Sequence, residues 1–216
     1  MPVSRLSSFQ RDVVRAFFAR ERRFFLTGGG ALVGFYLGHR ETEDIDLFAT
    51  QAVLEEGLQV LAVAAADLGA SIERLAEHPH IKRSLIRRGE ETLKVELVFE
   101  TATQWFPEKR EIDGILVDPP EEILANKLCT LLSRAEIRDL VDVLALERQG
   151  FRIEDALPAA MKKDGGLTPA QLAAVLSEWQ LGADALIPGG ISVAELDAYR
   201  RELIRRLARL AFPDAR

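Results

Sequence analysis

The arrangement of residues 24–49 constrains the fold of this chain more than any other feature. The segment FFLT has the length and the apolar residues of a short buried strand, and three glycines follow it directly. After a short apolar helix and a polar loop, the segment DIDLFA alternates between polar and apolar residues, which is typical of a half-buried strand. Ile45 and Leu47 should therefore face the core, whereas Asp44 and Asp46 should lie together on the opposite face.

The aspartate pair indicates a site for divalent cations. On a strand, the Cα atoms of Asp44 and Asp46 would be roughly 7 Å apart, so both carboxylates could contact one cation or two neighbouring cations. Without a counter-ion the two carboxylates would repel each other. Ligands that are all oxygens favour Mg²⁺ or Mn²⁺ over zinc. The alternative interpretation is that these aspartates only mark the solvated edge of a strand.

The glycines Gly28 to Gly30 fit the same interpretation. A glycine turn between a strand and a helix exposes backbone N–H groups, and the missing Cβ lets a bulky anion approach the backbone. A triphosphate could lie there, with its metal ions held by Asp44 and Asp46 opposite. In the alternative interpretation, the glycine run is only a turn.

A third carboxylate is expected on a neighbouring strand. The segment LKVELVFE is predicted to pair with residues 81–88 as a hairpin, with Lys94 and Glu96 on the face opposite to Val95 and Leu97. Glu96 could therefore reach the aspartate pair, where it would bind metal or accept the proton of an incoming hydroxyl. The alternative is an ordinary surface acid.

The chain is expected to divide at its Pro-Pro step, where predicted strands give way to predicted helices. Residues 1–118 should form an α/β lobe that includes a first helix over 7–21 and a longer helix ended by Gly69. Residues 119–216 should be helical, with a Thr168-capped helix and further helices over 121–133, 136–148 and about 193–211.

Two groups of residues form motifs that a known family shares. The first is Gly28-Gly29-Gly30-Ala31-Leu32 followed by Arg40-Glu41-Thr42-Glu43-Asp44-Ile45-Asp46-Leu47. The second is Lys127-Leu128, then Arg134, then Arg138-Asp139-Leu140-Val141-Asp142. With these motifs, which span residues 26–146, the chain resembles the AbiEii/AbiGii toxin family of the nucleotidyltransferase superfamily. The resemblance implies an α+β fold, with a nucleotidyltransferase-like N-terminal lobe around a mixed β-sheet and a C-terminal helical lobe.

The resemblance also implies a role for each motif residue. Gly28 and Gly29 would hold nucleotide phosphate, and Arg40 and Thr42 would position the nucleotide or brace the loop. The metal ligands and catalytic carboxylates would be Asp44, Asp46 and Glu96. In the helical lobe, Lys127 would contact the triphosphate, and Asp139 or Asp142 would orient the substrate or pair with Lys127 or Arg138. The alternative for this second motif is an ordinary charged helix face with local ion pairs.

The expected activity is a Mg²⁺-dependent transfer of a nucleoside monophosphate from an NTP to an acceptor hydroxyl, with Mn²⁺ as an alternative metal. The resemblance extends to a toxin of a type IV toxin–antitoxin or phage-defence system, with an antitoxin protein as partner. The acceptor is left open between tRNA and a protein hydroxyl. The rival interpretation is a non-catalytic nucleotide-binding or protein-interaction module that retains the fold.

Composition excludes some functional classes. The formal net charge of −6 over 216 residues argues against a basic surface for nucleic acid over the whole molecule. A single cysteine rules out an internal disulfide and suits a reducing cytoplasm. No signal-like segment is apparent, and no segment approaches the roughly 20 apolar residues that span a bilayer. We therefore expect a cytoplasmic protein without a membrane partner.

Overall fold

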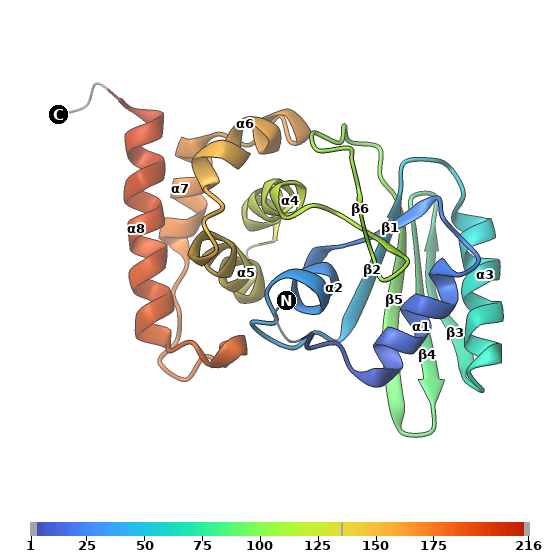
Figure 1. Cartoon of the computed structure of the whole chain (residues 1–216). Coiled ribbons are helices and arrows are strands. Elements are labelled where there is room, and N and C mark those ends of the chain that lie inside the picture. The colour runs from blue at the N-terminus through green and yellow to red at the C-terminus, as the bar shows by residue number, and fades with distance from the viewer. Residues whose placement is uncertain (1–3, 135, 214–216) are drawn as a thin grey trace. The chain divides into compact units, whose positions relative to one another are not determined.

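The computed structural model describes residues 4–134 and 136–213, which fall into two compact units (Figure 1). The first unit comprises Met1–Ala102 and Phe106–Pro119, and the second comprises Thr103–Trp105 and Pro120–Arg216. The short segment of the second unit is held by the backbone N–H of Trp105, which donates to Oε2 of Glu122 at 3.1 Å.

A mixed sheet forms the centre of the first unit. In the described residues, the strand order is β3-β4-β5-β2-β1-β7-β6. Strand β2 lies between an antiparallel neighbour, β1, and a parallel neighbour, β5, so residues on both sides flank its side chains. The strands are β1 (Phe24–Thr27), β2 (Asp44–Ala49), β3 (Ser71–His78), β4 (Ile81–Arg88), β5 (Glu91–Phe99), β6 (Arg110–Ile112) and β7 (Ile115–Val117).

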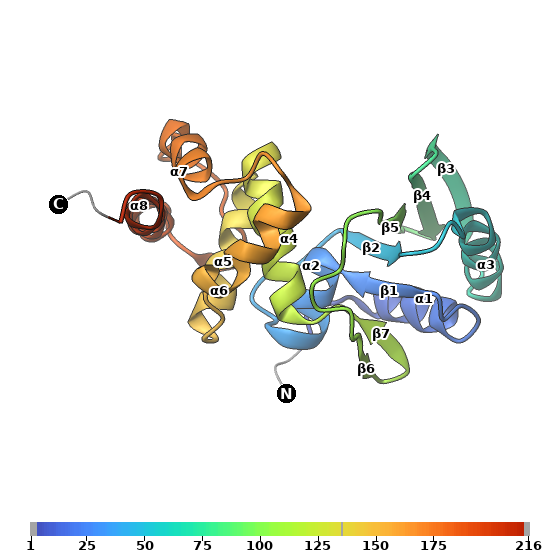
Figure 2. The same cartoon turned by 90° about the horizontal axis from the view of Figure 1, so that it is seen from above.

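The helices of this unit are α1 (Ser8–Phe18), α2 (Gly28–Ala31), which continues into one π-helical turn, η1 (Leu32–Tyr36), and α3 (Leu54–Asp67). Helix α1 begins with a capping box, in which Ser7 accepts the backbone N–H of Gln10 and the Gln10 side chain accepts that of Ser7. Helices α1 and α3 pack against each other on the same side of the sheet (Figure 2). The other side of β2 is not covered by these two helices.

The core of the first unit confirms the predicted alternation in β2. Ile45, Leu47 and Ala49 are fully buried, whereas Asp44 and Asp46 are half-buried on the other face. Beneath the sheet, the ring of Phe17 packs edge-on against that of Phe24, with 5.5 Å between the ring centroids. Apolar packing on one face thus fixes which face carries the carboxylates.

The second unit is helical in its described residues. It contains α4 (Pro120–Ser133), α5 (Ile137–Arg148), α6 (Ile153–Lys163), α7 (Pro169–Glu178), the 3₁₀ turn η2 (Pro188–Gly190) and α8 (Val193–Ala211). The predicted N-cap Thr168 is confirmed, since its side chain accepts the N–H of Gln171. Ser192 caps α8 in the same way by accepting the N–H of Glu195. Helix α6 was not delimited from the sequence.

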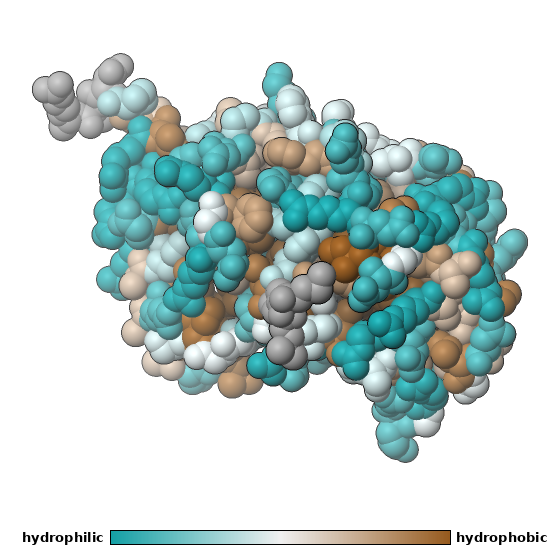
Figure 3. All heavy atoms as spheres, in the orientation of Figure 1, coloured by the Kyte–Doolittle hydropathy of each residue, from teal (hydrophilic) through white to brown (hydrophobic). Residues whose placement is uncertain are grey.

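Helix α8 is joined to its neighbours by charged groups. The Arg206 guanidinium pairs with Glu147 of α5 at 2.6 Å and with Glu154 of α6 at 2.8 Å. The α8 surface in Figure 3 is mostly hydrophilic, in keeping with a helix that buries Leu196, Leu203 and Leu207, although Leu210 is exposed. The mixed sheet with its separate helical unit confirms the predicted α+β class. No helix in the described ranges has the length and apolarity needed to cross a membrane.

Candidate functional site

The carboxylates of Asp44 and Asp46 lie at the start of β2, on the face opposite to the core. The burial of alternate residues along β2 fixes this orientation, because Ile45 and Leu47 are both fully buried. Asp46 faces Thr27 across the antiparallel pair with β1, so the end of β1 lies beside the carboxylates.

The glycine turn comes into direct contact with Asp46. The sequence predicted a helix after the glycines, but α2 begins at Gly28, so the glycines form its first turn. Gly28 has a φ of +63°, which is the left-handed region that disfavours other residues. A Cβ built on Gly28 would lie 3.4 Å from Cγ of Asp46 and closer still to Oδ2. Glycine is therefore required here for both backbone conformation and space.

Arg40 places a positive charge against the same turn. Its side chain is almost fully buried, and a Cβ on Gly29 would lie 2.6 Å from Nη2 of Arg40. Nη1 of Arg40 donates to the carbonyl of Glu41 at 2.8 Å, which fixes the guanidinium within its own loop. A buried guanidinium beside a glycine turn suits a phosphate group.

Thr42 braces the loop that precedes β2. Its hydroxyl donates to the carbonyl of Asp44 at 3.4 Å, and its own carbonyl accepts Nε2 of Gln10 at 2.7 Å. Gln10 was missed as a site residue, because its use as a loop brace depends on a partner 32 positions along the chain. The only local signal was its place three residues after Ser7, which indicated a helix cap.

Glu96 lies beside the aspartate pair on the neighbouring strand. In the parallel pair of β2 and β5, Asp46 is aligned with Glu96 and Asp44 with Lys94, so their side chains share a face. Oε1 of Glu96 accepts a hydrogen bond from Nε of Arg83 on β4 at 2.7 Å. This ion pair shows that Glu96 already contacts a cation of the protein.

The donor set suits a magnesium ion held partly by substrate. Among the described residues, no three carboxylate, imidazole or thiol side chains converge as a complete metal site. Mg²⁺ typically takes one or two carboxylates and completes its octahedron with waters and substrate phosphates. The pair of Asp44 and Asp46 next to the glycine turn provides such a partial set, and their oxygens match the hard cation.

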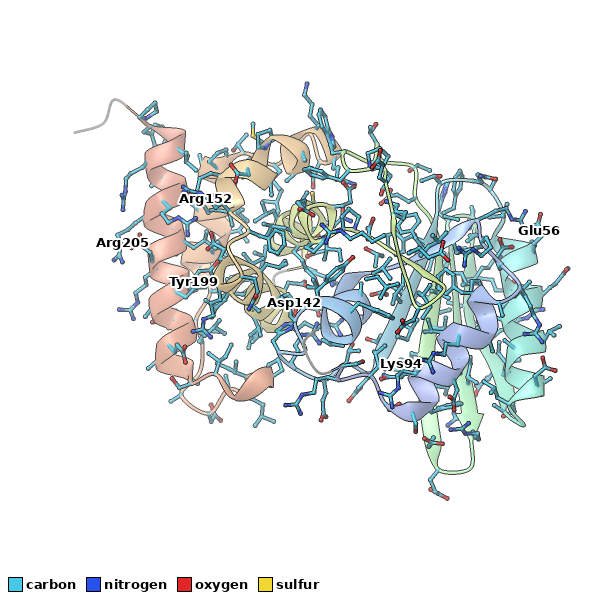
Figure 4. The ribbon with its side chains drawn as sticks, viewed as in Figure 1. Glu56, Lys94, Asp142, Arg152, Tyr199 and Arg205 are labelled. Carbon is cyan, nitrogen blue, oxygen red and sulfur yellow. The ribbon has the colours of Figure 1, made fainter. Side chains whose placement is uncertain are left out.

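The second motif forms a buried ion cluster in the helical unit. The Lys127 ammonium of α4 lies 2.7 Å from Oδ1 of Asp139 and 2.7 Å from Oδ2 of Asp142, both on α5 (Figure 4, which labels Asp142). Both carboxylates are fully buried, and Lys127 is 6% exposed. These residues do form ion pairs, as on an ordinary charged helix face, but the pairs are buried.

The charges of this cluster stabilise one another. Burial by itself would lower the pKa of Lys127, but the carboxylates of Asp142 and Asp139 outweigh burial and raise it. Burial would likewise raise the pKa of Asp139, but Lys127 and Arg134 outweigh burial and lower it. Lys127 and Asp139 are consequently both charged at neutral pH.

The second motif is divided between two helices, because α4 ends before Arg134 and α5 begins at Ile137, as the sequence predicted. Arg134 follows the end of α4, and its Nε donates to Oδ2 of Asp139 at 3.0 Å. Nε of Arg138 donates to Oε2 of Glu136 at 2.5 Å. Arg134 thus contributes to the ion cluster, whereas Arg138 pairs with Glu136.

A further polar group behind the glycine turn was also missed. Asp118, which is fully buried, accepts the hydroxyl of Thr27 and pairs with the ammonium of Lys109. The one available signal was the position of Asp118 directly after the apolar segment 115–117, where a polar residue at a strand end is a candidate for a site.

Comparison with known sequences assigns a family model to nearly the whole chain. The sequence matches the model described as Nucleotidyl transferase AbiEii toxin, Type IV TA system, over residues 12–212. A search of functionally curated proteins finds no match.

Solved structures with the same fold support this match. The nucleotidyltransferase toxin MenT4 from Mycobacterium tuberculosis is 14% identical, with a TM-score of 0.66 over 93% of this chain and 82% of that one. A Helicobacter pylori protein provisionally assigned as a nucleotidyltransferase is 22% identical, with a TM-score of 0.60 over 95% of this chain and 99% of that one. At these identities the similarity establishes the fold alone.

Proposed function

Because the chain belongs to the AbiEii nucleotidyl transferase toxin family of type IV toxin–antitoxin systems, we propose that it transfers a nucleoside monophosphate from an NTP to an acceptor hydroxyl. The observation that carries this proposal is the contact between the glycine turn and the aspartate pair. Gly28 leaves space for the Asp46 carboxylate at the point where a Cβ would displace it. A glycine turn that can bind phosphate, next to a carboxylate pair that can bind metal, suits phosphoryl transfer.

The glycine turn would hold the β- and γ-phosphates of the NTP. Backbone N–H groups at Gly28 and Gly29 would donate to phosphate oxygens, and the buried guanidinium of Arg40 would add positive charge behind them. Thr42, fixed through Asp44 and Gln10, would keep the loop in register with β2. These groups position the substrate before reaction, which is the larger part of catalysis in this chemistry.

Asp44 and Asp46 would hold Mg²⁺, or Mn²⁺ in its place, together with the phosphates. When bound, the metal would lower the pKa of the attacking hydroxyl and neutralise negative charge at the α-phosphate. The acceptor oxygen forms a bond to the α-phosphorus, the bond to the bridging oxygen breaks, and pyrophosphate leaves. Glu96, on the same face as Asp46, would accept the hydroxyl proton or complete the metal site.

Lys127 is proposed as the triphosphate contact of the helical unit. Its ammonium is held by Asp139 and Asp142, so its position is fixed before substrate binds. Asp139 is shared with Arg134, which brings a second cation to the cluster. The two aspartates would therefore orient the cation rather than act on substrate directly.

Loss of the aspartate pair tests the reaction. The wild-type protein, incubated with Mg²⁺, each α-labelled NTP and a cell extract, should transfer label to an acceptor, and fractionation into RNA and protein would identify it. Asp44→Asn and Asp46→Asn should abolish the transfer. Asp67→Asn, which alters a surface carboxylate of the same unit, is the matched control and should retain it. Persistence of transfer in both site variants would refute the assignment.

The ion pair of Glu96 and Arg83 favours a second candidate, a nucleotide-binding module without turnover. If Arg83 holds Glu96 away from the reacting groups, the site would bind an NTP together with its metal ion but would not catalyse nucleotide transfer. Calorimetric titration of NTPs with Mg²⁺, followed by a pyrophosphate assay over a long incubation, separates the two candidates. Metal-dependent binding without pyrophosphate release would favour the binding module.

Family membership also implies a toxin whose antitoxin partner relieves its effect. Expression of the wild-type chain should arrest bacterial growth, and Asp44→Asn expressed to the same level should not. A neighbouring gene product that restores growth would identify the antitoxin. Normal growth during expression of an enzyme with demonstrated transfer activity would contradict the toxin role.

A further inference from the structure

A buried polar group lies directly behind the glycine turn. Thr27 is the last residue of β1 and immediately precedes Gly28, and it is 3% exposed. Its hydroxyl donates to Oδ2 of Asp118 at 2.7 Å. Oδ1 of the same carboxylate lies 2.5 Å from Nζ of Lys109. One fully buried carboxylate thus connects a lysine to the residue from which the turn begins.

The same aspartate also holds the backbone of β1. The N–H of Asp118 donates to the carbonyl of Leu26 at 2.8 Å, directly after the parallel pairing of Leu26 with Val117. The end of β1 is therefore fixed twice by Asp118, through its main chain at Leu26 and through its side chain at Thr27. This position borders the glycine turn.

The lysine is itself directed by β1. Nζ of Lys109 lies 4.0 Å from the centroid of the Phe25 ring, within the range of a cation–π interaction. Phe25 is buried, so its ring is a rigid support. Lys109 is thereby placed where its charge is available to the buried carboxylate of Asp118, which would otherwise be costly to bury.

The Thr27 hydroxyl is used in an unusual way. A threonine at the N-cap of a helix commonly accepts a backbone N–H of the first turn. Thr27 occupies the N-cap of α2, yet its side chain makes no such bond. The hydroxyl is instead directed to Asp118, which fixes the side-chain rotamer and the direction in which the chain enters Gly28.

The location of Thr27 gives this group a consequence for the site. Thr27 is aligned with Asp46 across β1 and β2, and the next residue, Gly28, contacts the Asp46 carboxylate. Any shift of Thr27 changes the separation between the turn and that carboxylate. The hydroxyl also stabilises the buried carboxylate of Asp118, so its effect on the turn has to be measured separately from its effect on stability.

We propose that Asp118, paired with Lys109, is a positioning residue that acts through the Thr27 hydroxyl to set the distance between the glycine turn and Asp46. This inference rests on the proposed function and adds residues outside the family motifs. Asp118 does not contact the reacting groups in this proposal. It fixes the residue that introduces the turn, so that NTP and metal bind in one geometry.

Paired substitutions at Thr27 test the proposal. Thr27→Val removes the hydroxyl and keeps the shape, whereas Thr27→Ser keeps the hydroxyl. Titration calorimetry with the four NTPs and Mg²⁺ should give a Kd raised about tenfold for Thr27→Val and changed less than about threefold for Thr27→Ser. Asp118→Asn should resemble Thr27→Val. Ser84→Ala, which removes a buried hydroxyl elsewhere in the sheet, is the control and should bind as wild type does.

The outcomes separate this inference from the proposed function. If Thr27→Val lowers the melting temperature but binds NTP with the wild-type Kd, the hydroxyl is only structural and the inference is overturned. Equal weakening in Thr27→Ser and Thr27→Val also overturns it, because the hydroxyl would then be irrelevant. If the wild-type protein binds no NTP with Mg²⁺, the proposed function fails first and the inference fails with it.

Discussion

Replacing Gly28 with alanine tests whether the geometry of the glycine turn determines the reaction rate, apart from the effect of the substitution on stability. Gly28 has a φ of +63°, and a side chain in this left-handed conformation costs about 1–2 kcal/mol of folding free energy. The new Cβ would also lie inside the contact distance of the Asp46 carboxylate. To restore an ordinary separation of about 3.5 Å, that carboxylate must move by about 1 Å. A displacement of this size lowers the rate by about 10²-fold.

Gly69→Ala is the matched control. Gly69 has a φ of +65°, and no described atom lies within 4 Å of a Cβ built there, so the substitution introduces the same backbone strain without the contact. Urea denaturation should show that both variants fold, each with the loss of about 1–2 kcal/mol that the backbone strain causes, and with any further loss in Gly28→Ala due to the contact with Asp46. Pyrophosphate release with Mg²⁺ and NTP in the presence of a cell extract should fall about 100-fold in Gly28→Ala and remain near wild type in Gly69→Ala. Equal activities in the two variants would refute the argument.

Three further predictions concern the remaining carboxylates and the ion cluster. Glu96→Gln should lower the rate of pyrophosphate release at least about 100-fold, whereas Arg83→Gln should lower it less than about threefold. Equal losses in the two variants would show that Glu96 acts only through its ion pair with Arg83. Lys127→Met should lower the free energy of unfolding by about 3–5 kcal/mol, because two carboxylates stay buried without their lysine, and a loss below about 1 kcal/mol would contradict this. The pKa of Asp139 is lowered in the folded state, so its contribution to stability should be present above about pH 4 and disappear as the pH falls through its folded pKa. Urea denaturation at pH 7 to 3 should therefore show a steeper loss for wild type than for Asp139→Asn, and parallel curves would contradict it.

The face of β2 was predictable from sequence because it depends only on local backbone periodicity. Once Ile45 and Leu47 are buried, Asp44 and Asp46 must lie on the other face. The caps Thr168 and Ser192 were predictable for the same reason, since each bonds a backbone N–H three residues away.

Long-range partners were not predictable in this way. Glu96 was placed correctly on its strand, but its ion pair with Arg83 depends on the register of β4 against β5. Asp139 and Asp142 lie on the helix predicted over 136–148, but their complete burial depends on how α5 packs within the helical unit. Asp118 had no local pattern to distinguish a buried acid from a solvated one.

Short or interrupted helices and strands were also difficult to predict from the sequence. Strand β6 has three residues, too few for a periodic pattern, and it forms only by pairing with β7. Helix α6 contains Pro158, which usually ends a helix, and apolar packing of residues such as Leu157 outweighs that tendency. Tertiary contacts decided both cases.

The central claim is that Asp44 and Asp46 hold a divalent cation next to the glycine turn. Measuring Mn²⁺ binding by electron paramagnetic resonance tests this claim most directly. With a non-hydrolysable NTP analogue present, the wild-type protein should bind Mn²⁺ more tightly than without it, because phosphate oxygens complete the coordination. Asp44→Asn and Asp46→Asn should lose this nucleotide-dependent binding. Mn²⁺ binding that is the same in the wild-type protein and both variants, with or without the analogue, would contradict the account.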